Sequence, residues 1–105
     1  MDLTSINFSE FKNKKILITG GSTGIGAELV RAFAKHGAII GLLYLSSEEA
    51  ANQVASEIRD EGGSVELIRA DVSDSKALAA AVNEAAERLG GLNGLINNAG
   101  GMVRR

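Results

Sequence analysis

The sequence predicts an α/β fold in which a parallel sheet is covered by helices on both faces. Short apolar segments rich in β-branched residues alternate along the chain with segments of helical periodicity. The second strand segment, 38–44, is nearly all apolar, as expected for a parallel strand buried on both faces. A glycine-rich turn, 19–26, separates the first strand segment from the first helical segment. These features predict a three-layer α/β/α architecture with strand order 3-2-1-4.

The composition excludes several function classes. The chain has 105 residues, a net charge of −2, one histidine and no cysteine. Neither a disulfide framework nor a thiolate metal site is possible, and we predict no metal site. Acidic and basic residues are interspersed, which argues against nucleic-acid binding. No apolar run approaches the roughly 18 residues of a membrane span, and no signal-peptide pattern opens the chain, so we expect a cytoplasmic protein that does not bind membranes.

The turn Thr19-Gly20-Gly21-Ser22-Thr23-Gly24-Ile25-Gly26 is predicted to bind phosphate. Gly20 allows a sharp turn, Gly24 lets the backbone approach a pyrophosphate, and Gly26 lets the helix pack closely against the strand. The N–H groups and the positive end of the helix then face the phosphates. A turn without a ligand is the alternative for the glycines alone. The predicted contacts of this turn are Gly20, Ser22, Thr23, Gly24, Ile25 and Gly26.

The remaining elements follow in order from periodicity and end signals. The first strand spans 14–19, and the helix from Ala27 ends near His36, with Gly37 in a left-handed conformation after it. His36, the only histidine, is interpreted as interacting with the helix dipole and not as catalytic. The second helix runs to about Glu61 and is ended by two glycines. Its sheet-facing residues are predicted to be Ala51, Val54, Ala55 and Ile58.

The third β-α unit and the fourth strand complete the pattern. The segment 64–70 alternates like a strand near the edge of the sheet, and the fourth strand spans 92–96. Between them lies an alanine-rich helix, for which Ser73 or Asp74 is the predicted N-cap. Its buried face is predicted to contain Leu78, Val82, Ala85 and Leu89.

The end of the second strand is predicted to meet the adenosine ribose of a dinucleotide. A carboxylate about 20 positions after the glycine turn would bind the 2′-hydroxyl of NAD, but Tyr44 and then Ser46 stand there. The missing carboxylate and the serine hydroxyls favour NADP over NAD. The margin is narrow, because no Arg or Lys stands there or just before Gly24. Ser46 also lies three residues before Glu49, so a capping box is an alternative role.

Asp71 and Val72 are predicted to contact the adenine ring. Asp71 follows the third strand, where its carboxylate can accept a hydrogen bond from the adenine amino group while Val72 packs on the ring. This role is compatible with capping by the residues that follow, since ligands in open α/β sheets bind beyond the carboxyl ends of the strands.

Two motifs in this order resemble the short-chain dehydrogenase/reductase family. The first is T-G-x-x-x-G-x-G at 19–26, and the second is Asn97-Asn98-Ala99-Gly100 after the fourth strand. The resemblance covers nearly the whole chain and implies a Rossmann-like NAD(P)-binding domain. It also implies that Asn98, Ala99 and Gly100 line the nicotinamide ribose side of the site and that this motif steadies the sheet.

The resemblance implies an oxidoreductase, but the catalytic residues of the family are not found in this sequence. A catalytic serine and a Tyr-x-x-x-Lys pair occur later in family members, whereas the only tyrosine here, Tyr44, is followed four residues on by Glu48. We therefore expect residues 1–105 to be the N-terminal portion of a single domain, truncated after the fourth strand and inactive alone, with the substrate undefined. Its exposed fourth strand predicts a homo-oligomer. A free-standing nucleotide-binding or self-associating module is the alternative.

Overall fold

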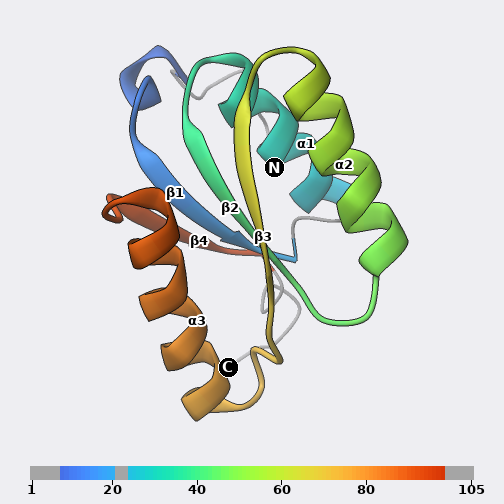
Figure 1. Ribbon diagram of the computed structural model, residues 1–105, viewed down its shortest axis with the longest axis vertical. Coiled ribbons are helices and arrows are strands. Elements are labelled where there is room, and N and C mark those ends of the chain that lie inside the picture. Colours follow the sequence, from blue (N-terminus) through green and yellow to red (C-terminus); the bar gives the residue numbers. More distant parts are fainter. Residues whose placement is uncertain (1–7, 21–23, 99–105) are drawn as a thin grey trace.

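The computed structural model describes residues 8–20 and 24–98 and confirms the predicted fold class (Figure 1). Four parallel strands form one sheet in the order β3-β2-β1-β4. The elements in chain order are η2 (Phe8–Phe11), β1 (Lys15–Thr19), α1 (Gly24–Lys35), β2 (Ile39–Tyr44), α2 (Glu48–Asp60), β3 (Ser64–Arg69), α3 (Ser75–Leu89) and β4 (Gly94–Asn97). Helices α1 and α2 cover one face of the sheet and α3 covers the other (Figure 1).

Alternation along the strands produces two core clusters. On the α1/α2 face, Ile16 and Ile18 of β1 and Ile40 and Leu42 of β2 are fully buried against the two helices. All four residues predicted to face the sheet from α2 are buried there. On the α3 face, Leu17, Leu43 and Ile68 pack against α3. The β-branched and leucine side chains therefore fill both faces of the central strands, which explains why 38–44 reads as continuously apolar.

The buried face of α3 differs slightly from the prediction. Ala85 and Leu89 are buried as predicted, while Leu78 and Val82 are only partly buried at the margin of the cluster. Ala81, which was not predicted, is buried between them. The small side chain lets this turn of the helix approach the sheet closely, so the buried stripe is centred one position away from the larger residues.

The predicted helix ends are confirmed at α1 and α3. Gly37 adopts φ +92°, and the N–H groups of Gly37 and Ala38 donate to the carbonyls of Ala34 and Phe33, both at 3.0 Å. Asp74 is the N-cap of α3, since its carboxylate accepts from the N–H groups of Lys76 and Ala77. Helix α1 begins at Gly24 and not at Ala27, so the last two glycines of the turn lie in its first turn.

The segment before β1 packs against the domain from Phe11 onwards. The ring of Phe11 lies edge-on to that of Phe33 in α1, with ring centroids 4.9 Å apart.

Within the described part of the chain, none of the helices has the length and apolar character needed to cross a bilayer.

Candidate functional site

The carboxyl ends of the four strands form one edge of the sheet, and the predicted site residues lie along it. Parallel register pairs Thr19 with Leu43 and with Asn97, and Tyr44 with Arg69. The register continues past the strands, because the N–H of Gly20 donates to the Leu43 carbonyl at 3.0 Å. Segments that are 20 to 80 positions apart in the sequence are thereby brought together at one edge, as ligand sites in open α/β sheets require.

The glycine turn has the geometry predicted for Gly20 and Gly26. Gly20 adopts φ +66°, a conformation that costs other residues strain. A Cβ atom placed on Gly26 would lie 2.0 Å from the Gly20 carbonyl oxygen and 2.7 Å from Nδ2 of Asn98. Only glycine therefore fits where α1 crosses the end of β1.

Gly24 differs from Gly26 in its surroundings. It adopts φ +58°, and a Cβ placed on it would meet no atom of the described residues within 4 Å. Ile25 beside it is half-exposed, with 50% of its surface accessible. Packing within the described chain thus does not require a glycine at position 24, although the backbone conformation favours one. The space into which this Cβ would point is thus not occupied by the other described residues, and the prediction places a pyrophosphate here.

The Asn97-Asn98 segment joins β4 to β1 through side-chain amides. Thr19, which is buried, donates from Oγ1 to Oδ1 of Asn97 at 2.9 Å. Nδ2 of Asn98 donates to the carbonyl oxygen of Gly20 at 3.2 Å. One asparagine accepts and the other donates across the strand ends, which fixes the start of the glycine turn relative to β4.

Asn93 makes a further link between β1 and β4 that the sequence did not indicate. Its side-chain oxygen accepts from the backbone N–H of Lys15 at 2.8 Å, and its own N–H donates to the Lys15 carbonyl at 2.7 Å. These bonds lie at the amino end of the two strands and set their register from the side opposite the predicted site.

At the adenosine end, the predicted capping box is wrong. The N-cap of α2 is Ser47, with φ −92° and ψ 58°, and its side chain makes no capping hydrogen bond. At this ψ the residue is outside the extended conformation that directs an N-cap hydroxyl at the first-turn N–H groups. Ser46 lies one residue further out and is exposed, while Tyr44 is half-buried against the α1/α2 core cluster.

Arg69 is a basic residue at this end that the local sequence around β2 did not reveal. It is the last residue of β3 and the register partner of Tyr44. Its Nε donates to the carbonyl oxygen of Leu45 at 3.0 Å. A signal existed in the order of the strands, because neighbouring parallel strands end side by side. The residues next to Tyr44 in the sequence give no sign of it, since Arg69 is 25 positions away.

Asp71 and Val72 lie just beyond β3, at the same edge. Oδ1 of Asp71 accepts from the hydroxyl of Ser73 at 2.7 Å and from its backbone N–H at 2.9 Å. The Ser73 hydroxyl and then the Ser73 N–H hold the pKa of the Asp71 carboxyl below its ordinary value of 3.8. Val72 is half-buried against the α3 core cluster. The turn thus keeps the carboxylate charged and fixed in position.

Four of the predicted site residues, Ser22, Thr23, Ala99 and Gly100, lie outside the described residues. The structure brings the others to one edge: Gly20, Gly24, Ile25 and Gly26 at the turn, Tyr44 and Ser46 after β2, Asp71 and Val72 after β3, and Asn98 after β4.

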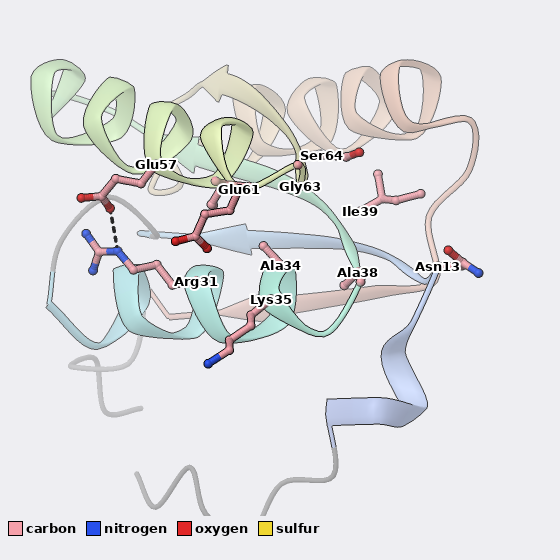
Figure 2. A pocket seen from close by; sticks show the side chains of 13 residues that line it. Asn13, Arg31, Ala34, Lys35, Ala38, Ile39, Glu57, Glu61, Gly63 and Ser64 are labelled. Carbon is pink, nitrogen blue, oxygen red and sulfur yellow. Dashed lines mark hydrogen bonds and ion pairs between the residues drawn. The ribbon is translucent and has the colours of Figure 1, made fainter.

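A pocket of about 930 Å³ lies at the opposite end of the sheet, between the last turns of α1 and α2 (Figure 2). Figure 2 shows Arg31 of α1 and Glu57 of α2 joined across it by an ion pair at 2.9 Å. Lys35 and Glu61 add one further charge of each sign. None of the predicted site residues lines this pocket. Its balanced charges and its position at the amino ends of the strands do not match a dinucleotide site.

Comparison with known proteins identifies relatives of this chain. The family model described as short chain dehydrogenase matches residues 14–105. The probable galactose dehydrogenase GalD of Rhizobium meliloti is 35% identical over 99 residues, which make up 94% of this chain and 39% of that protein. General stress protein 39 of Bacillus subtilis is 40% identical over 91 residues, 87% of this chain and 32% of that protein.

Solved structures agree with the sequence matches. A short-chain dehydrogenase/reductase from Serratia marcescens superposes with a TM-score of 0.81 at 40% identity, covering 84% of this chain and 36% of that one. A blue fluorescent protein from a metagenomic library, solved in complex with NADPH, superposes with a TM-score of 0.76 at 34% identity, covering 81% and 35%. This chain thus spans less than two fifths of the length of each of these four proteins. The chain belongs to the short-chain dehydrogenase family.

Proposed function

We propose that this chain is the dinucleotide-binding part of an NAD(P)-dependent oxidoreductase, in which hydride passes between nicotinamide and a carbonyl or alcohol substrate. The observation that carries the proposal is the contact of Gly26 with Gly20 and Asn98. Any side chain at position 26 would overlap the Gly20 carbonyl. The start of α1 is thereby held against the ends of β1 and β4, where its N–H groups can face a pyrophosphate. The NADPH complex of a structural neighbour supports the same ligand class.

The proposed ligand contacts follow the edge of the sheet. The pyrophosphate lies over the turn, the adenosine ribose at the end of β2, the adenine at the end of β3 and the nicotinamide ribose beyond β4. Oδ1 of Asp71 is used by Ser73, whereas Oδ2 makes no hydrogen bond to any described residue and remains available to the adenine amino group. The proposed contacts are Gly20, Ser22, Thr23, Gly24, Ile25, Gly26, Tyr44, Ser46, Asp71, Val72, Asn98, Ala99 and Gly100.

We propose that these 105 residues bind the nicotinamide cofactor but do not turn over a substrate. Hydride transfer requires a proton donor or acceptor beside the reacting carbon. The only tyrosine, Tyr44, lies at the adenosine end and is partly buried in the core, and no Tyr-x-x-x-Lys occurs in the sequence. We therefore propose that the chain binds the nicotinamide cofactor, with NADP narrowly favoured over NAD, without reducing or oxidising a substrate. A cytoplasmic location stays a prediction that cell fractionation would test.

A second proposal, self-association through β4, is favoured by Leu95. Strand β4 is at the edge of the described sheet, and Leu95 on its α3 face is 48% exposed. Ile96, on the other face, is half-buried against the α1/α2 cluster. An edge strand with an exposed leucine is suited to pairing with a second copy of the chain. A dimer mass in light scattering that becomes monomeric in Leu95→Glu supports this proposal. A monomeric mass at high protein concentration contradicts it.

The cofactor proposal is tested by titrating the purified chain with NADPH and NADH, following nicotinamide fluorescence and verifying the intact mass. Saturable binding of at least one nucleotide is expected. Gly26→Ala should abolish it, while Gly94→Ala should preserve it, because a Cβ at Gly94 meets only the flexible end of Ile16 at 3.3 Å. Circular dichroism shows whether each variant is folded. Absence of binding by the folded wild-type chain would contradict the proposal.

A further inference from the structure

We propose that Arg69, together with Ser46, binds the 2′-phosphate of NADP, so that the cation which selects this cofactor comes from β3 and not from β2. The inference rests on the proposed function, because it concerns one end of the same site. It provides a physical basis for the preference for NADP over NAD, which the residues next to Tyr44 favour only by a narrow margin.

The position of the Arg69 guanidinium is fixed by the strand beside it. Arg69 ends β3 in register with Tyr44, and its Nε donates to the carbonyl oxygen of Leu45 at 3.0 Å. The charge therefore lies beside the first residue after β2, where a dinucleotide fold meets the adenosine ribose. One hydrogen bond of the fork is used to hold the group, which reduces the conformational freedom lost when a phosphate binds.

The rest of the guanidinium is free to bind a ligand. Among the described residues, its two terminal nitrogens make no hydrogen bond, and no carboxylate lies within 4.0 Å of Arg69. Of the other exposed arginines, Arg31 and Arg88 have glutamate partners, while Arg59 donates to the backbone carbonyl of Val65. A guanidinium with an unused pair of parallel donors matches a phosphate in both charge and geometry.

Ser46 adds an exposed hydroxyl donor at the residue that follows Leu45. It is exposed and precedes the N-cap of α2, so it has no capping role that would compete with a ligand. Ser47 does not cap this 13-residue helix with its side chain either, so that side chain does not occupy the first-turn N–H groups at the positive end of the helix.

Glu48 and Glu49 oppose an anion at this end. Both are exposed in the first turn of α2. Their repulsion would act through water and be screened by salt, whereas the guanidinium would touch the phosphate directly. If the glutamates dominate, they would accept hydrogen bonds from an unphosphorylated ribose and the chain would prefer NADH. The first possibility predicts tighter binding of NADPH, and the second predicts tighter binding of NADH.

The experiment compares the dissociation constants of NADPH and NADH for the wild-type chain, Arg69→Gln and the control Arg88→Gln. Arg88 is a matched control because it also donates to a backbone carbonyl, that of Leu67 at 2.9 Å, but from α3. The wild type should bind NADPH more tightly. Arg69→Gln should reduce the ratio of the two affinities about tenfold while the NADH affinity changes less than about twofold. Ser46→Ala should reduce the ratio by a smaller factor, and Arg88→Gln should not change it.

The dependence of binding on salt concentration is a second readout, and it would not change if Arg69 only anchored the loop at Leu45. Added NaCl should weaken NADPH binding more than NADH binding in the wild type, and this difference should be lost in Arg69→Gln. An equal loss of both affinities in Arg69→Gln would show that the residue only anchors Leu45 and would overturn the inference. Tighter binding of NADH by the wild type would also overturn it. Failure of the wild type to bind either nucleotide would refute the proposed function as well.

Discussion

Replacing Gly26 by alanine should destabilise the chain by about 2 kcal/mol, because the added methyl group meets backbone and not a movable side chain. Its Cβ would lie 2.0 Å from the Gly20 carbonyl oxygen and 2.9 Å from the carbonyl carbon. Overpacking of this kind costs typically about 1–3 kcal/mol, and a backbone contact belongs at the upper end. Alanine gains at most about 1 kcal/mol over glycine in a helix, which offsets part of the loss.

Urea denaturation followed by circular dichroism measures this effect, since the chain has no tryptophan for fluorescence. Gly94→Ala is the control, because its Cβ meets only Cδ1 of Ile16 at 3.3 Å, and we expect a change below about 0.5 kcal/mol. The denaturant slope should stay constant in both variants. If Gly26→Ala is as stable as the wild type, α1 does not cross β1 as closely as described, and the reasoning is refuted.

Two further predictions concern Asp74, the N-cap of α3, and Asp71, which precedes it. Asp74→Ala removes the side chain that accepts from two first-turn N–H groups, so it should cost about 1 kcal/mol in urea unfolding. Ser47→Ala, at an N-cap without a side-chain bond, should cost almost nothing, and equal losses would contradict this account of the caps. For Asp71, a lowered folded pKa means that its contribution to stability is present above pH 3.8 and is lost as the pH falls through the folded value. A carboxyl NMR titration should show this lowered pKa, and Ser73→Ala should bring it back toward the ordinary value.

The fold could be predicted because each element carries its own local signals. The apolar run 38–44, the left-handed Gly37 and the N-cap Asp74 depend on neighbours in the sequence, and the structure confirms all three. The prediction of a capping box at Ser46 was also made from local sequence, and it was wrong. The sequence has the spacing of a capping box, but the N-cap of α2 is Ser47, one residue later than the serine that the spacing selects.

The candidate site was predictable only where a motif or the end of a predicted strand marked it. The contact between Asn98 and Gly20 joins residues 78 positions apart, and the motif order indicated both without showing their hydrogen bond. Arg69 has no motif and lies on another strand than Tyr44, so it became visible only through the register of β2 with β3. Parallel pairing is non-local, and side chains that meet at the ends of strands cannot be paired from local spacing.

The most direct test of the account is an NMR titration of the isotope-labelled chain with NADPH, which shows where a ligand binds. We expect amide shifts at Gly20, Gly24, Arg69 and Asp71 along the carboxyl edge of the sheet. The pocket at the opposite end, marked by Arg31 and Glu57, serves as the internal control and should not shift (Figure 2). Shifts confined to that pocket, or none at any concentration, would contradict the claim that this fold binds a nicotinamide dinucleotide at its carboxyl edge.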